Sequence, residues 1–285
     1  MPTIQERVAT ARQTLRDAGI GAHEAGFSAR LLAEHVLGWN SARYFTSAHE
    51  LEPPQFAEQY DALVARRAAR EPAAYITGLK EFWGLELEVS PAVLIPRPET
   101  ELIVEVATEF LRGESGPLTV ADAGTGSGCL AVALARELPA ASIVATDISY
   151  EALEVARRNA VAHGVVDRIR FAYADLLEGI DGPFDLIVCN PPYVRSGDRP
   201  ALQPEVRDYE PSVALFGGAS GIEVVAAIVE QAGPRLRPSG WLVFEFGLGQ
   251  DEAVENLLAA TPGLTLLELR RDLQGIARTA VVRKD

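Results

Sequence analysis

The chain has little cysteine, little histidine and no long apolar run, and each shortage argues against one class of protein. Its 285 residues include two cysteines, Cys129 and Cys189, both in apolar runs, which predicts small buried side chains in a reducing compartment. The four histidines show no ligand-like spacing, so we expect no metal site. No stretch approaches the roughly 18 apolar residues that span a bilayer. The first residues, with Glu6, Arg7 and Arg12 among them, lack the apolar core of a secretion signal, so we expect a cytoplasmic protein.

Basic residues are also scarce. The chain has 26 lysines and arginines against 40 acidic residues, which gives a net charge of −14. Such a field repels a polyphosphate at long range and disfavours a nucleic-acid substrate, although a local basic patch can survive an acidic total. No P-loop lysine follows the glycine-rich turn described below, and we find no internal repeat. The length favours two domains over one.

Residues 1–73 carry apolar side chains at helical spacing and predict a small helical domain. The first helix begins at Ile4 and ends before Gly19, and the second runs from Ser28, as its N-cap, to Leu37. Such a bundle either stabilises the chain or docks a macromolecular partner, and both alternatives stay open at this point. A third helix follows a pair of prolines and would bury Phe56, Tyr60, Leu63, Val64 and the stem of Arg67.

The spacing of apolar residues along the chain changes after residue 73. Residues 74–98 show a period of two between glycines, which predicts a β-hairpin linking two domains, and a helix should follow over residues 99–111. In the second domain, residues 99–285, strands alternate with helices, so we expect a mostly parallel sheet covered on both faces. The last two strands follow one another without a helix and should pair antiparallel. The expected strands are 119–123, 142–147, 169–174, 184–189, 241–246, 264–269 and 276–282, and the helices lie near 130–138, 150–163 and 222–236.

A glycine-rich turn joins the first strand of this sheet to its helix. Gly124, Gly126 and Gly128 let the backbone turn tightly and let a ligand approach the amide groups at the start of the helix. A dinucleotide fingerprint would read G-x-G-x-x-G, but its third glycine position falls on Cys129. This mismatch weakens a nicotinamide interpretation.

Carboxylates follow the next two strands. Asp147 lies 23 residues after Gly124, where it can accept hydrogen bonds from ribose hydroxyls. Asp175 ends the third strand, and Leu176 beside it is a suitable edge for an adenine ring. Each aspartate alone is more often a helix cap or a turn residue. Their placement after successive strands favours a ligand site.

The tetrapeptide Asn190-Pro191-Pro192-Tyr193 comes 62 residues after Gly128, directly after an apolar run. A carboxamide or base-amine nitrogen has a delocalised lone pair, so methyl transfer to it requires that its N–H bonds be held. Asn190 offers a side-chain oxygen, the prolines offer a stiff backbone with outward carbonyls, and Tyr193 offers a ring face for stacking. The alternative is an ordinary turn that ends a strand. A position downstream of a nucleotide-type loop, at a strand end, favours methyl transfer.

Together, these motifs resemble the class I S-adenosylmethionine-dependent methyltransferases and, more narrowly, the PrmC/HemK family. That family methylates the side-chain amide nitrogen of the glutamine in the Gly-Gly-Gln motif of class I peptide chain release factors. The Ile-Pro-Arg-Pro-Glu-Thr-Glu segment is the most diagnostic part. The resemblance rests on residues 82–85, 94–101, 122–128, 147–149, 190–193, 209–211 and 214–218.

The resemblance implies an α/β fold, with a seven-stranded, mostly parallel sheet that ends in an antiparallel hairpin and a small N-terminal helical bundle that docks the substrate. It implies S-adenosylmethionine as methyl donor, S-adenosylhomocysteine as product, release factors as partners and a role in translation termination. Positioning the amide in line with the methyl group would supply much of the rate without a strong base. The expected cofactor-binding residues are Gly124, Thr125, Gly126, Ser127, Gly128, Asp147, Asp175, Leu176 and Asn190; Asn190, Pro191, Pro192 and Tyr193 would bind substrate, with Asn190, Pro191 and Tyr193 catalytic.

Several alternatives remain from the sequence. Segment 195–220, rich in proline, glycine and charge, is either a plain loop or, in our hypothesis, helps to close over the incoming glutamine loop. Arg97 and Glu99 either begin a solvated helix or act near the active site, and Glu245 either lines the cleft or caps its strand, so none of the three is assigned to the site. Rival functions are methylation of a base amine in DNA or RNA, a nucleotide-binding interaction module without chemistry, and a nicotinamide dehydrogenase. For the dehydrogenase, no proton-relay histidine or tyrosine–lysine pair is evident.

Overall fold

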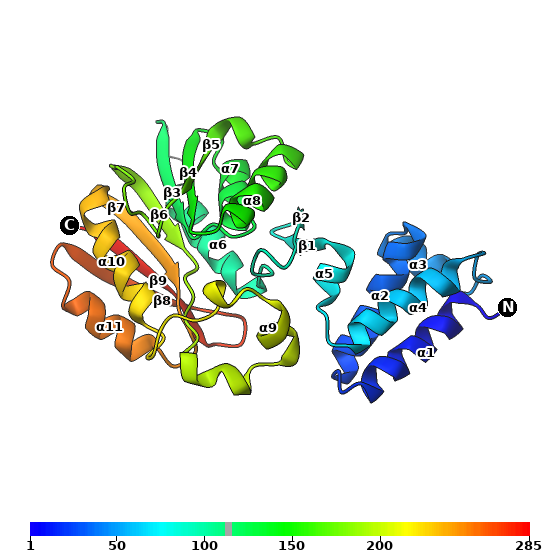
Figure 1. The fold of residues 1–285 in the computed structure, drawn as a ribbon. Coiled ribbons are helices and arrows are strands. Elements are labelled where there is room, and N and C mark those ends of the chain that lie inside the picture. Colours follow the sequence, from blue (N-terminus) through cyan, green and yellow to red (C-terminus); the bar gives the residue numbers. More distant parts are fainter. Residues whose placement is uncertain (112–115) are drawn as a thin grey trace. The chain divides into compact units, whose positions relative to one another are not determined.

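The computed structural model describes residues 1–111 and 116–285, which divide into two compact units (Figure 1). The first unit contains Met1–Leu79 and Gln203–Tyr209, and the second contains Lys80–Leu202 and Glu210–Asp285. A short stretch of the predicted second domain therefore belongs to the helical unit, and the domain limits at residues 73 and 98 stay a prediction. Among the described residues, no helix is long and apolar enough to cross a membrane.

The helical unit forms around apolar stripes of the expected kind. Helix α1 begins with a capping box, in which the Thr3 hydroxyl accepts from the Glu6 amide and the Glu6 carboxylate accepts from the Thr3 amide. In α4, Phe56 and Tyr60 stack with ring centroids 5.1 Å apart, and the Tyr60 hydroxyl donates to the Ala29 carbonyl. The helices are α1 (Ile4–Asp17), α2 (Ala22–Leu37), α3 (Ser41–Ser47), α4 (Phe56–Ala68) and α5 (Ala73–Thr77).

Helix α2 starts earlier than the sequence pattern indicates. It begins at Ala22, so the prediction of Ser28 as its N-cap is wrong. The first turns bury small residues such as Ala25, whose weak apolar signal hides the helical period. Ser28 is fully buried within the helix, where its hydroxyl oxygen accepts a hydrogen bond from Nε of Arg67.

A buried arginine joins α4 to the short helix α9 (Pro204–Tyr209) inside the helical unit. Arg67 is 2% exposed, and its Nη2 lies 2.9 Å from Oε1 of Glu205. Arg70 contacts the other carboxylate oxygen at 2.6 Å, and the Tyr209 hydroxyl donates to the Ala69 carbonyl. A buried charge is stable only when it is paired, so Glu205 holds α9 in place.

The second unit is built on one seven-stranded sheet with the strand order β5-β4-β3-β6-β7-β9-β8. Neighbouring strands from β5 to β7 pair parallel, whereas β9 pairs antiparallel with both β7 and β8. The expected linking hairpin forms a separate sheet of β1 (Leu79–Phe82) and β2 (Leu85–Glu88). The large sheet consists of β3 (Leu118–Ala123), β4 (Ala141–Asp147), β5 (Ile169–Tyr173), β6 (Phe184–Cys189), β7 (Leu236–Glu245), β8 (Leu264–Arg271) and β9 (Ala277–Lys284).

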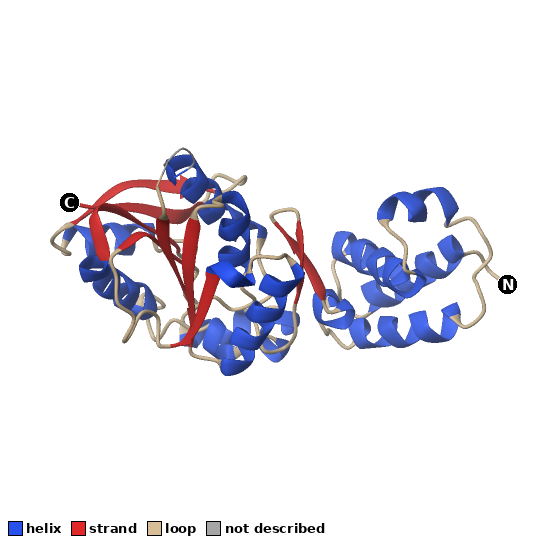
Figure 2. Ribbon diagram, turned by 90° about the horizontal axis from the view of Figure 1, so that it is seen from above, coloured by secondary structure: helices blue, strands red, loops and turns tan. Residues whose placement is uncertain are grey.

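Helices cover both faces of this sheet (Figure 2). Strand β6 is buried throughout, with Leu186 and Val188 in one apolar core and Ile187 and Cys189 in the other. Nearly continuous apolar runs of this kind, here broken only by Asp185, are typical of parallel strands buried on both faces. The first core packs against α6 (Glu101–Leu111), α7 (Cys129–Glu137) and α8 (Tyr150–Ala162), and the second against α10 (Glu223–Arg235) and α11 (Asp251–Ala259).

Helix α11 was not expected from the sequence. It buries only Val254 and Leu258, so its apolar stripe is too short to stand out from a charged surface segment. Segment 195–220 also contains structure that its composition concealed, because α9 is flanked by the 3₁₀ helices η3 (Ser196–Ala201) and η4 (Ser212–Ala214). The predicted α/β sheet with its antiparallel end is otherwise confirmed.

The sheet topology brings the predicted motifs to one edge. Strand β3 lies between β4 and β6, so the chain order reverses at this point. The carboxyl ends of these parallel strands carry the glycine turn, Asp147 and Asn190, and β7 ends beside them at Glu245. Open α/β sheets bind ligands at such a switch point.

Candidate active site

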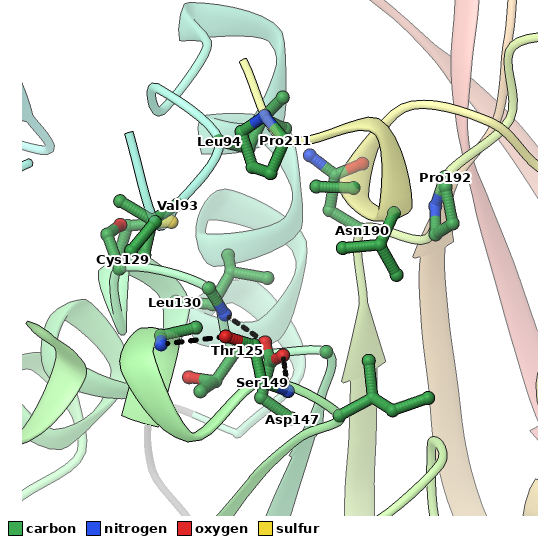
Figure 3. Close-up of a pocket in the computed structure, with 18 of the residues that line it drawn as sticks. Val93, Leu94, Thr125, Cys129, Leu130, Asp147, Ser149, Asn190, Pro192 and Pro211 are labelled. Carbon is green, nitrogen blue, oxygen red and sulfur yellow. Dashed lines mark hydrogen bonds between the residues drawn. The ribbon is translucent and has the colours of Figure 1, made fainter. Parts of the chain in front are cut away.

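A pocket of about 260 Å³ opens at this edge of the sheet. In Figure 3, Asn190 and Pro192 lie on one side of the pocket, and Val93 and Cys129 lie on the opposite side. Gly128, Pro191 and Tyr193, which the sequence also indicated, are not among its lining residues. The predicted residues that do line it are Gly124, Thr125, Gly126, Ser127, Asp147, Asp175, Leu176, Asn190 and Pro192.

The glycine turn leaves open space beside its backbone. Gly124 and Gly126 have φ angles of +72° and +54°, and a Cβ atom on either would meet no atom within 4 Å. Gly128 has a different role, because a Cβ there would lie 3.0 Å from the Cβ of Ala156. The first two glycines therefore leave room for a ligand in the pocket, while the third lets α8 pack closely against the turn.

Asp147 shapes the turn from the end of β4. Its Oδ2 accepts a hydrogen bond from the Gly126 amide at 2.8 Å, and its Oδ1 accepts from the Ser149 amide at 2.9 Å. Burial raises the pKa of Asp147, and these backbone hydrogen bonds oppose the shift. A carboxylate has about four acceptor positions, so Asp147 keeps capacity for ligand hydroxyls.

A second aspartate supports the turn from below. Asp122 is fully buried at the end of β3, and its Oδ2 accepts from the Thr125 hydroxyl at 2.6 Å and from the Ala131 amide at 3.1 Å. Burial raises its pKa to about 7, against the effect of these hydrogen bonds. The negative charge of Asp147 adds to the rise.

The Asn-Pro-Pro-Tyr tetrapeptide is tied to a buried carboxylate at the end of β7. Nδ2 of Asn190 donates to the Thr100 hydroxyl at 2.8 Å, and that hydroxyl donates to Oε2 of Glu245 at 2.7 Å. The Tyr193 hydroxyl donates to Oε1 of Glu245 at 2.9 Å. Burial, followed by the adjacent Glu245, raises the pKa of Tyr193. Tyr193 thus supports the turn from beneath, and its stacking on substrate stays a prediction.

Thr100 and Glu245 were not assigned a role from the sequence. Thr100 lies inside the diagnostic 94–101 segment, and Glu245 interrupts the apolar run of β7. A charged residue within such a run is a signal of a buried polar function. What the sequence does not show is that the two side chains, 145 positions apart, share a hydrogen bond.

Glu210 joins its own motif to the 94–101 segment beside the pocket. The Arg97 guanidinium contacts Oε1 of Glu210 at 2.5 Å, and the Ile95 amide donates to Oε2 of Glu210 at 3.2 Å. Glu210 is buried, so these contacts fix the backbone around Ile95 and Arg97 against Glu210.

The end of segment 195–220 packs on the tetrapeptide backbone. The Val194 amide donates to the Leu215 carbonyl, and the Gly217 amide donates to the Val194 carbonyl, both at 2.9 Å. A Cβ on Gly217 would collide with the Pro192 carbonyl, so only glycine allows this approach. The segment also supplies Pro211, Val213, Ala214 and Phe216 to the pocket lining.

The pocket residues fit an adenosyl group. Open space beside Gly124 and Gly126, a carboxylate at Asp147 and the apolar side chains of Ile148 and Leu176 occupy the same cavity. Leu176 has a φ of +51°, unusual for a residue with a side chain, and its carbonyl accepts a 2.6 Å hydrogen bond from Thr146. Strained backbone of this kind concentrates at ligand sites.

Comparison with known proteins shows which family the chain belongs to. The model of the PrmC N-terminal domain matches residues 6–78, and that of the methyltransferase small domain matches residues 100–203. A release factor glutamine methyltransferase of Bradyrhizobium diazoefficiens is 40% identical, with 99% of this chain and 97% of the relative covered. The chain belongs to this family.

A second family member, from Nitratidesulfovibrio vulgaris, is 42% identical and covers 99% of this chain and 96% of its own length. The family expected from the motifs is therefore confirmed. A solved methyltransferase structure from Pyrococcus furiosus has a TM-score of 0.52 at 20% identity and covers 79% of this chain and 96% of its own. That likeness agrees with the predicted class I methyltransferase fold.

Proposed function

We propose that the protein transfers the methyl group of S-adenosylmethionine to the side-chain amide nitrogen of the glutamine in the Gly-Gly-Gln motif of class I release factors, and thereby modulates translation termination. One observation carries the proposal: a nucleotide-type turn and Asn190 of the tetrapeptide line a single pocket. An adenosyl donor held at the turn and an amide held at Asn190 would then meet in one cavity. S-adenosylhomocysteine would be the product.

The chain's own residues would hold the donor at three points. The turn at residues 124–128 gives the donor access to backbone amides, Asp147 accepts ribose hydroxyls, and Asp175 with Leu176 borders the adenine. When bound, S-adenosylmethionine supplies an electrophilic methyl group on a sulfonium centre. The apolar lining from Val93, Leu94 and Phe216 would keep water from this reactive group.

The tetrapeptide would hold the acceptor amide. Oδ1 of Asn190 and the carbonyl oxygen of Pro191 would each accept a hydrogen bond from one of the two N–H groups of the substrate glutamine. These bonds strengthen as the nitrogen becomes pyramidal and more acidic, so they favour the transition state over the planar ground state. As the N–C bond forms, the S–CH₃ bond of the donor would break to leave S-adenosylhomocysteine, and one N–H proton would pass to solvent water. Orientation and hydrogen bonding, not a strong base, would supply the rate.

We further propose that the helical unit docks the release factor and that segment 195–220 closes over its glutamine loop. The net charge of −14 disfavours a nucleic-acid substrate, and a translation factor as substrate places the protein in the cytoplasm. Trimming segment 195–220 should slow turnover. Equal turnover after trimming would remove the closing role.

The test is methyl transfer from labelled S-adenosylmethionine to a purified class I release factor. A matched factor with its Gly-Gly-Gln glutamine replaced, a DNA and an RNA serve as parallel acceptors. We expect label on the unmodified factor alone. Label on DNA or RNA would favour methylation of a base amine, and donor binding without label anywhere would favour an interaction module.

A further inference from the structure

Asn190, Thr100 and Glu245 form a relay of hydrogen bonds at the pocket wall, where Figure 3 shows Asn190. They come from three separate elements: Asn190 follows β6, Thr100 ends the 3₁₀ helix η1 (Pro98–Thr100), and Glu245 ends β7. Thr100 and Glu245 are each 1% exposed, while Asn190 and Thr100 line the pocket. The relay therefore connects a buried carboxylate to the proposed substrate site.

The direction of each hydrogen bond follows from the chemistry of the buried end. The Thr100 hydroxyl donates its single proton to Oε2 of Glu245. The Thr100 oxygen can then only accept from Asn190, which must present its Nδ2 and not its Oδ1. The Thr100 hydroxyl, oriented by Glu245, thus selects one of the two possible orientations of the Asn190 amide.

Glu245 also holds the far end of the tetrapeptide. Its second carboxylate oxygen accepts from the Tyr193 hydroxyl, so both ends of residues 190–193 are linked to one side chain. Burial raises the pKa of Glu245, with Glu99 adding to the rise and the hydroxyls of Thr100 and Tyr193, together with Arg278, opposing it. An apolar side chain at this place would avoid the cost of burying a carboxylate. A carboxylate is nevertheless present here, and its role is to orient the hydroxyls of Thr100 and Tyr193.

We propose that Thr100 and Glu245 are positioning residues that hold the Asn190 amide with Oδ1 as the acceptor at the pocket. The inference rests on the proposed function, in which Oδ1 receives an N–H of the substrate glutamine. A reversed Asn190 amide would set its own N–H groups against those of the substrate. The relay therefore presents a hydrogen-bond acceptor, Oδ1 of Asn190, to the substrate. The carboxamide of a glutamine has N–H groups to donate to it, whereas the carboxylate of a glutamate has none.

The experiment compares Thr100→Val, which has nearly the shape of threonine but lacks the hydroxyl, with Thr100→Ser, which keeps it. For Thr100→Val we expect kcat for release factor methylation to fall about 100-fold, the loss typical of a misplaced reacting group, with little change in KM or in the dissociation constant for S-adenosylmethionine. Thr100→Ser should recover most of kcat. Thr108→Val, which removes a buried hydroxyl that bonds only the Glu105 carbonyl among the described residues, is the matched control and should leave kcat unchanged.

A second readout does not depend on turnover. The side-chain NH₂ resonances of Asn190, assigned with an Asn190→Ala variant, should shift in Thr100→Val and return in Thr100→Ser. Full kcat or an unmoved Asn190 resonance in Thr100→Val would overturn the relay. If Thr100→Val does not fold, Thr100→Ala takes its place under the same criteria. An unmodified enzyme that methylates no release factor would refute the proposed function, whereas the resonance still tests the relay.

Discussion

The side chain of Asn159 in α8 donates a hydrogen bond to the carbonyl oxygen of Ser127 in the glycine turn, 2.8 Å away. The same NH₂ group donates to the Glu88 carbonyl at 2.9 Å, and Oδ1 accepts from the Glu88 amide at 2.7 Å. Asn159 is 1% exposed, so these bonds join the cofactor turn to the end of the β1–β2 hairpin without competition from water.

Replacing Asn159 with Ala should therefore weaken both stability and donor binding. A buried backbone group left without a partner costs about 1–3 kcal/mol. The contact to Ser127 is buried and the two to Glu88 are only partly buried, so we expect a loss of roughly 2–5 kcal/mol in the free energy of unfolding. Urea denaturation and calorimetry with S-adenosylmethionine measure the two effects. Asn256→Ala, at an exposed position of α11, is the control and should change neither.

Gly128→Ala tests the contact between the turn and α8. The new Cβ would lie 3.0 Å from Ala156 Cβ and 3.1 Å from its Cα, so the turn must shift. Gly263→Ala is a close match, because Gly263 has the same φ of +80° but open space around a Cβ. The control should lose only the ~1–2 kcal/mol of a left-handed alanine. Gly128→Ala should lose more and should bind S-adenosylmethionine at least tenfold more weakly; equal losses in both variants would refute steric contact as the cause.

Asp122 should make the protein less stable as pH rises. Its folded pKa of about 7 exceeds the ordinary 3.8, so the native state keeps a proton that the unfolded chain releases between these values. The free energy of unfolding should therefore fall with a slope of up to about 1.4 kcal/mol per pH unit from this group between about pH 4 and pH 7. Denaturation curves of the protein and of Asp122→Asn, compared across that range, isolate the contribution. Parallel pH profiles would show that Asp122 does not titrate there.

The attachment of α9 should be sensitive to acid. Burial raises the pKa of Glu205, but hydrogen bonds from Arg70 and Arg67 outweigh it and hold the pKa below the ordinary 4.5. The stabilisation is thus fully present above pH 4.5 and is lost as pH falls through the folded pKa. The protection factors of residues 203–209 against amide exchange, which correct for the pH dependence of the intrinsic rate, should fall at low pH and, at neutral pH, in Glu205→Gln. Glu58→Gln, at an exposed position of α4, should leave that exchange unchanged.

The sequence predicts what local patterns determine. The β6 bounds at residues 184–189 match the structure, because that strand is a short run, apolar except for Asp185, between turn signals. The glycine turn, Asp147 and Asn190 meet in one pocket because each directly follows a parallel strand. Pairings between distant residues escaped prediction. The Arg67–Glu205 hydrogen bond spans 138 positions and the Thr100–Glu245 hydrogen bond spans 145. The periodicity of the sequence does not indicate which distant residue is the partner.

The chain returns to the helical unit at Gln203 and leaves it again after Tyr209. The helical unit is therefore discontinuous in sequence, and the two units do not simply follow one another along the chain. Cutting the backbone between Leu79 and Lys80 would leave one fragment with Arg67 and Arg70 and the other with their carboxylate partner. Fragments made separately should each expose half of that charged contact, and mixing them should restore it. Removing the first 79 residues is therefore not a clean deletion of a domain, because it also removes the arginine partners that hold α9.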